Sequence, residues 1–251
     1  MYLSPLESFS ILNIIGITSP LLNIDYQITN NSLFLIISFI LLMILMVANN
    51  KIIGNNIVPS NVNIISECFW ASGLTISRNS ANNQAYLPLI LSLFGTILLS
   101  NLISNIPYSY ASASSLSFSL GLSVTIFIAV TALAIHLKGI TFWSTFVPSS
   151  APLALVPLLI VIELISYLAR ALSLGIRLFA NLVAGHTLTH IVSSMSVKIL
   201  LSGILGMFIF IVPMVLLVML TGLELAVALI QAYVFVVLAS IYINEAQTPL
   251  A

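Results

Sequence analysis

The sequence predicts an all-α integral membrane protein with about five membrane-crossing helices and one interfacial amphipathic helix. Of its 251 residues, 60% are hydrophobic and only 5% are charged, whereas soluble domains carry about 25% charged residues. The apolar residues are gathered in long runs, and several crossing helices are needed to accommodate them. The last two helices are predicted to be long and steeply tilted, forming an antiparallel hairpin. The whole chain, residues 1–251, is interpreted as a single membrane domain.

Composition also excludes several classes of function. The net charge is zero, so nucleic acid is not expected as a partner. The single cysteine, Cys68, excludes an internal disulfide and a four-cysteine zinc site. The sequence has no glycine-rich phosphate loop and no metallopeptidase motif, so we expect no cofactor and no metal. Residues 1–23 lack a basic segment followed by an apolar core, and no cleavable secretory signal is expected.

The first third of the chain predicts one crossing helix and one surface helix. A mixed leader, residues 1–31, precedes an apolar run at residues 32–48 that is long enough for a first span. Residues 61–78 mix apolar and polar side chains around Trp70, which predicts a helix lying along the membrane surface. A plain loop is the alternative for this stretch.

Residues 86–137 are predicted to form a helical hairpin. Its spans are residues 86–106 and 120–137, and an uncharged segment rich in serine and alanine joins them. A bent connection with three prolines, residues 139–157, leads into the last part of the chain.

The segment 158–247 holds the predicted pair of long helices. Residues 158–197 contain no proline, and residues 204–245 contain only Pro213. Forty helical residues measure roughly 60 Å, about twice the thickness of the hydrocarbon core. Each segment could break into two spans or form one tilted helix. The absence of a good break in the first segment favours a tilted helix, since its length exceeds what ordinary tilts accommodate.

Basic residues near the span ends predict the orientation of the chain. With five crossings, Lys51, Arg78 and Lys138 fall on one side of the membrane and Lys198 falls on the other. By the positive-inside rule, the loops on the inner side of a membrane carry the excess of Lys and Arg. We therefore expect the N-terminus outside and the C-terminus inside, where inside is the matrix for a mitochondrial protein.

Polar side chains are concentrated in the first long helix. A charge at the centre of a bilayer costs roughly 2.5–3.5 kcal/mol, so each such residue needs a partner, a water-filled cavity or a function. An internal ion pair that locks helices together is the simplest alternative. The residues concerned are Glu163, Arg170, Arg177, Asn181, His186 and His190.

An antiparallel pairing of the two long helices arranges these residues in layers. If the hairpin turns near residues 202–204, two residues lie at equal depth when their residue numbers add up to the same total, called here the index sum. The helical repeat also places Arg170, Arg177 and Asn181 on one face, with His186 about half a turn away, on the face of His190. The layers are Glu163 with Glu245 on the inner side, Arg177 with Gln231 at the centre and His186 with Glu224 on the outer side.

This arrangement indicates two polar pockets, one open to each membrane surface, with a fixed positive charge between them. Arginine keeps its proton at any physiological pH, whereas carboxylates and histidine exchange protons. Without a third carrier the pockets are dead ends, and a moving carboxylate would complete the path. Small residues on the first long helix would let the helix of that carrier approach closely; they are Ala171, Gly175, Ala180 and Ala184.

The stretch from Ala169 to His186, ARALSLGIRLFANLVAGH, resembles subunit a of the F-type ATP synthase, in its fungal mitochondrial form. The resemblance covers nearly the whole chain. It includes Ser4-Pro5-Leu6-Glu7, the run from Asn101 to Tyr108, the run from Val147 to Pro157 and the run from Glu224 to Tyr233.

The resemblance implies a stationary proton-path subunit that lies beside a ring of c subunits, in the mitochondrial inner membrane, and is not catalytic alone. Other membrane-sector and peripheral-stalk subunits are implied as partners. The sequence has Glu245 where the family often has aspartate, and Ala171 where many relatives have proline. The implied roles are Arg177 as the essential charge facing the ring carboxylate, Asn181 and Gln231 close to it, His186 and Glu224 on the intermembrane-space path, and Glu163 and Glu245 on the matrix-side path.

Three other interpretations are weaker. A self-contained channel or secondary transporter often has two similarly broken halves, and the sequence has no such repeat. A purely structural anchor does not need Arg177 and three polar layers in a chain so poor in charge. A zinc site at His186 and His190 has the right helical spacing but no third ligand in the sequence.

Overall fold

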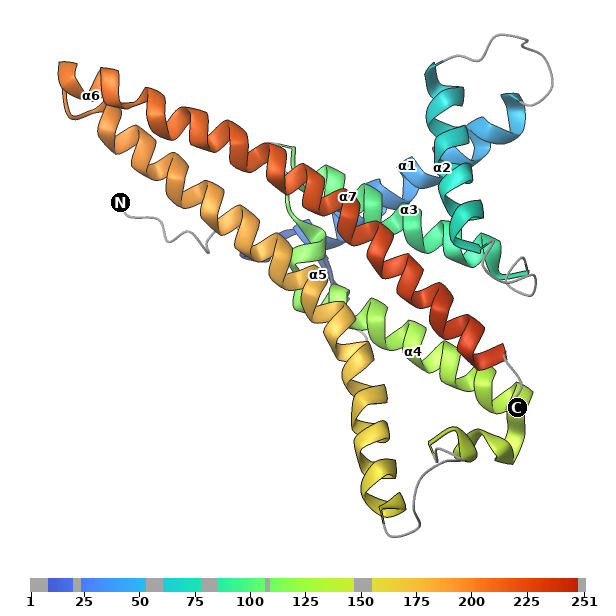
Figure 1. The fold of residues 1–251 in the computed structure, drawn as a ribbon. Helices are drawn as coiled ribbons and strands as arrows, with labels where there is room; N and C mark the ends of the chain where they lie inside the picture. Colours follow the sequence, from blue (N-terminus) through green and yellow to red (C-terminus); the bar gives the residue numbers. More distant parts are fainter. Residues whose placement is uncertain are drawn as a thin grey trace.

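The computed structural model describes residues 9–19, 24–52, 61–77, 85–106, 109–146 and 155–247. The motif at residues 4–7, Arg78 and the proline-containing connection at residues 147–154 lie outside this part of the chain. Helices make up most of the described residues (Figure 1), and five of them are long and apolar enough to cross a membrane. The predicted all-α membrane fold is confirmed.

A β-hairpin precedes the first helix. Strands β1 (Asn13–Ser19) and β2 (Ile24–Thr29) pair antiparallel. The sequence predicts only a mixed leader in this region, so the hairpin is an addition to the predicted fold. The neighbouring residues Ile14 and Ile15 of β1 are both exposed, so the strand shows no alternation of buried and exposed side chains at these two positions.

Three helices follow on one side of the molecule: α1 (Asn30–Ile52), α2 (Asn61–Ser77) and α3 (Leu87–Ser104) (Figure 1). Two reciprocal hydrogen bonds cap the start of α1: Thr29 N–H donates to Ser32 Oγ at 3.0 Å, and Ser32 N–H donates to Thr29 Oγ1 at 3.4 Å. Helix α2 packs on α1 and α3, and Phe69 stacks on Phe94 with 5.3 Å between ring centroids. The stretch is therefore a helix and not a loop, while its position at the membrane surface stays a prediction.

Helix α4 (Leu116–Lys138) lies between two short 3-10 helices, η3 (Ser112–Ser114) and η4 (Gly139–Phe146). The small residues of η3 are buried and let this segment pack against α3, α4 and α5. Gly139 ends α4 with φ +57°, a backbone conformation that glycine adopts without strain.

Helix α5 (Val156–Leu200) is unbroken over 45 residues. The short α6 (Ile204–Ile209) and α7 (Ile211–Gln247) complete the hairpin after a turn at Gly203, whose φ is +110°. The break between α6 and α7 at Phe210 lies just before Pro213, which cannot donate a backbone hydrogen bond to the preceding turn. At roughly 67 Å, α5 is far longer than the hydrocarbon core is thick. One helix, and not two spans, is thus the correct alternative for the first long segment, while its tilt in the membrane stays a prediction.

The long helices lie side by side only along part of their length. Figure 1 shows the second half of α5 running next to α7, whereas its first half bends away, and α4 packs against both helices there. The core lies where α3, α4, α5 and α7 meet, around the fully buried Leu178, Phe235 and Val236. Two cavities border this core, one beside α4 and one beside α3.

Candidate functional site

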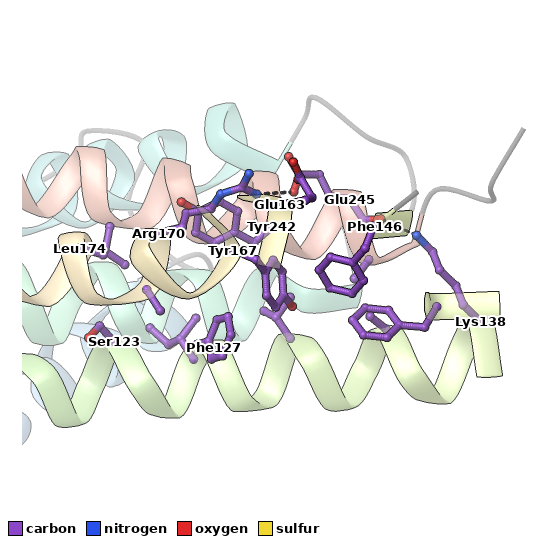
Figure 2. A pocket seen from close by; sticks show the side chains of 16 residues that line it. Ser123, Phe127, Lys138, Phe146, Glu163, Tyr167, Arg170, Leu174, Tyr242 and Glu245 are labelled. Atoms are coloured by element: carbon purple, nitrogen blue, oxygen red, sulfur yellow. Dashed lines mark hydrogen bonds and ion pairs between the residues drawn. The ribbon is translucent and has the colours of Figure 1, made fainter. Parts of the chain in front are cut away.

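The first cavity, called here the α4 pocket, has a volume of about 270 Å³ and lies between α4, α5 and α7 (Figure 2). Aromatic rings of Phe142, Phe146, Tyr167 and Tyr242 form much of its wall. Charged side chains from three helices share it, namely Lys138 from α4, Glu163 and Arg170 from α5, and Glu245 from α7.

An ion pair crosses the α4 pocket. Arg170 Nη1 lies 2.9 Å from Glu245 Oε2, drawn as a dashed line in Figure 2, and its guanidinium carbon lies 5.2 Å from the centroid of the Tyr242 ring. Lys138 Nζ donates to the main-chain carbonyl of Glu245 at 2.9 Å. That carbonyl belongs to the last turn of α7, where helical partners are absent and a cation is favourable.

Glu163 and Glu245 line the same pocket, and their position at equal depth stays a prediction. Glu245 contacts Arg170, which follows Glu163 by seven residues, about 10 Å along α5. The index sum assumes two straight neighbouring helices, whereas the first half of α5 bends away from α7 (Figure 1). Within the described residues, no hydrogen bond or ion pair engages the Glu163 carboxylate.

The second cavity, the α3 pocket, also measures about 270 Å³ and lies between α3, α5 and α7. Asn181 Nδ2 donates to Gln231 Oε1 at 3.1 Å, and Asn101 Nδ2 donates to the carbonyl of Ala228 at 3.4 Å. The polar side chains that line it are Asn101, Asn105, Asn181, His186, Glu224 and Gln231. The predicted central and outer layers therefore share one pocket, apart from Arg177.

Several polar atoms of the α3 pocket are buried without a partner in the described part of the protein. They include His186 Nε2, Glu224 Oε1 and Gln231 Nε2. Gly185 lets the Glu224 carboxylate approach the α5 backbone, since a β-carbon there would stand 2.9 Å from Oε1. A cavity of this size with several unsatisfied donors and acceptors on its wall is well suited to ordered water.

Arg177 lines neither pocket. On α5 the wall of the α4 pocket ends at Leu174 and that of the α3 pocket begins at Leu178. The Arg177 side chain is exposed, and it makes no hydrogen bond or ion pair with any residue that the structure describes. A guanidinium thus stands on the outer surface of α5 at the level where one polar cavity gives way to the other.

The sequence profile of the ATP synthase A chain family matches residues 32–244. The chain belongs to the ATP synthase A chain family. Proteins named ATP synthase subunit a are similar over nearly their full length: that of Mycosarcoma maydis is 45% identical over 97% of this chain and 96% of the relative. Those of Emericella nidulans and Candida parapsilosis are 43% and 38% identical, over 97% and 98% of this chain and 95% and 98% of the relatives. The predicted family is confirmed.

Membership in the ATP synthase A chain family settles the general role. The chain is a membrane-sector subunit of ATP synthase, works within that complex with other subunits, and is not catalytic alone.

Two of the small residues predicted to face a moving carrier have another role in this ATP synthase A chain. Gly175 packs on α4, where a β-carbon would meet Ser123 Oγ at 2.5 Å and the Ser119 carbonyl at 2.9 Å. Ala171 is buried on the wall of the α4 pocket. Gly175 lies two residues before Arg177, so it faces the opposite way on the helix. Only Ala180 and Ala184 are exposed like Arg177.

Sequence reasoning missed part of both pockets. Asn101 and Asn105 are four residues apart in an apolar span and so share one helix face, which is a signal for a polar wall. Arg170 and Lys138 engage Glu245. The seven-residue spacing of Arg170 and Arg177 indicates a shared face, but the sequence gives no sign that Arg170 pairs within the chain and Arg177 does not.

Proposed function

We propose that this subunit provides the stationary proton path of the F-type ATP synthase membrane sector, as two offset half-channels that serve a ring of c subunits. The observation that carries the proposal is the exposed guanidinium of Arg177, unpaired within the described residues and positioned between two polar cavities. A charge in the apolar layer needs a counter-charge, and a carboxylate on a neighbouring ring is the partner that fits.

The two pockets supply the half-channels. His186 and Glu224 of the α3 pocket receive protons from the intermembrane space, and Glu163 and Glu245 of the α4 pocket belong to the matrix side. Asn181, one turn beyond Arg177, and its hydrogen-bonded partner Gln231 are polar neighbours of the ring carboxylate. The two cavities have polar side chains on their walls and no described polar path joins them, so a proton has to travel between them on the ring.

Arg177 separates the half-channels because it cannot pass a proton on. A protonated ring carboxylate is neutral and can move through lipid, whereas an ionised one stays opposite the arginine. Each proton that crosses 100 mV supplies about 2.3 kcal/mol. The directed movement of the carboxylate past Arg177 turns that energy into rotation of the ring, which is coupled to ATP synthesis.

The proposed location is the mitochondrial inner membrane, with the N-terminus toward the intermembrane space and the C-terminus toward the matrix. The distribution of basic residues supports this orientation. The exposed apolar side chains of α1 and α7 support contact with lipid or with other membrane-sector and peripheral-stalk subunits. The described helices pack around one core, which supports a single membrane domain.

The test is Arg177→Ala in the assembled complex. We expect ATP synthesis driven by a proton gradient to fall to background, because the ring carboxylate loses its counter-charge, while native electrophoresis shows a normal amount of complex. His136→Gln is the control, since His136 is an exposed residue near the end of α4 that lines neither pocket. Coupled synthesis that survives in Arg177→Ala would refute the role of this residue.

A further inference from the structure

The two carboxylates of the α4 pocket have different surroundings. Glu245 is held at two points: its carboxylate by Arg170 of α5 and its main-chain carbonyl by Lys138 of α4, each at 2.9 Å. Tyr242 lies one turn before Glu245 on α7 and presents its ring to the same guanidinium, at 5.2 Å. Three helices thus converge on Glu245, and Figure 2 shows Arg170 and Tyr242 beside it, with Lys138 at the edge of the view.

Glu163 lacks such a clamp. Its exposed side chain lies two turns before Arg170 on α5 and lines the pocket, and no described residue donates a hydrogen bond or ion pair to its carboxylate. The contrast matters because arginine already occupies a carboxylate oxygen of Glu245 as a hydrogen-bond acceptor. The Glu163 carboxylate at the pocket wall has no described partner and stays open to water and to a passing carrier.

Resting on the proposed function, we propose that Glu245 is a positioning residue, the fixed counter-ion of Arg170, and that Glu163 is the carboxylate through which the α4 pocket exchanges protons. The Arg170–Glu245 pair then fixes the spacing of α5 and α7 where α5 bends away, and so keeps the pocket open. The carboxylate of Glu245 also balances the positive charge of Arg170. Arg177 then remains as the arginine of this helix face whose charge no described carboxylate balances.

Reversal of the pair separates the two roles. We would compare Arg170→Glu, Glu245→Arg and the double reversal in intact complexes in inner-membrane vesicles, measuring the rate of ATP synthesis under an imposed proton gradient. Each single reversal should lower the rate about tenfold or more, because like charges then face each other, and the double reversal should restore it to within about threefold. Glu163→Gln should abolish synthesis, and the double reversal combined with it should not restore synthesis.

A second set of variants covers the case in which the single reversals do not assemble. The neutral double variant Arg170→Gln with Glu245→Gln should then exceed Glu245→Gln alone, because no unpaired arginine remains. A double reversal as slow as Glu245→Arg, or a neutral double variant as slow as Glu245→Gln, would show that the carboxylate at position 245 is itself needed. Either result would overturn the inference. Full synthesis in Glu163→Gln would also overturn it. Full rates in Glu163→Gln and in both single reversals would instead remove the α4 pocket from the proton path and overturn the proposed function.

Discussion

Glu224 shows how one side chain can combine burial with access. Its Oε1 is buried without a partner in the described chain, yet the residue lines the α3 pocket together with His186. A group that is enclosed but faces a polar cavity can take up a proton from water and pass it to a neighbour over a short distance. Under the proposed function, this position suits Glu224 as a relay between the outer surface and the ring.

We predict that Glu224→Gln slows proton uptake from the intermembrane-space side by about tenfold or more, since the amide keeps the shape of the side chain but cannot relay a proton. Proton flux through the assembled complex, started by an acid pulse on that side, measures the effect. The matched control is Glu67→Gln, because Glu67 is exposed on α2 and lines neither pocket. Equal flux in wild type and Glu224→Gln would remove Glu224 from the path.

At the residue scale, sequence reasoning grouped Glu163 with Glu245 and His186 with Glu224, and each pair shares a pocket, but it did not predict the ion pair of Glu245. The index sum predicts His186 level with Glu224, and both line the α3 pocket next to Gly185. The same sum predicts Glu163 level with Glu245, but Glu245 pairs with Arg170. The simple alternative of an internal ion pair thus applies to Arg170 and not to Arg177, a difference that depends on the bend of α5.

At the scale of elements, the contact between α4 and α5 depends on small residues. Gly175 brings the α5 backbone against Ser119 and Ser123 of α4, the close approach that small residues allow in membrane helices. This contact holds α5 where it borders the α4 pocket.

We predict that Gly175→Ala lowers the stability of the subunit by roughly 1–3 kcal/mol, because the added methyl group overpacks the helix contact. The thermal midpoint of the purified complex and the amount of assembled complex would report the loss. Gly121→Ala is the matched control, since a β-carbon at Gly121 meets nothing within 4 Å. Identical midpoints for the two variants would show that the α4–α5 contact tolerates extra volume.

The helices themselves were largely predictable, because length and apolar runs decide them. The first long segment contains no proline and forms one helix, whereas Pro213 in the second coincides with the α6–α7 break. The pairing of residues 13–19 with residues 24–29 was not predictable, since these strands are stabilised by pairing with each other and the neighbouring residues Ile14 and Ile15 are both exposed.

At the scale of the whole molecule, α5 is long and apolar enough to cross a membrane, and the two ends of a crossing helix lie at opposite surfaces. The turn at Leu201, whose side chain is 80% exposed, follows the C-terminal end of α5, and Ile140, 90% exposed, lies just after α4 on the other side. Both positions are outside the pockets. They therefore report orientation without touching the proton path.

We predict that Leu201→Cys reacts with a membrane-impermeant maleimide from the intermembrane space and that Ile140→Cys reacts only from the matrix. Both substitutions would be made together with Cys68→Ser, since the native cysteine is exposed. Labelling of mitochondria with opened outer membranes, compared with inverted vesicles, distinguishes the sides. The reverse pattern, or labelling of both positions from one side, would contradict the proposed orientation.

The unpaired state of Arg177 within the described chain has a consequence for biogenesis. Lipid around a lone guanidinium costs roughly 2.5–3.5 kcal/mol, and that penalty disappears only when an acidic neighbour arrives. Under the proposed function, a newly inserted copy is less stable before it meets the ring than after it, which favours an order of assembly in which the ring is complete first. Copies that never meet a ring would then be the ones most open to degradation by membrane proteases.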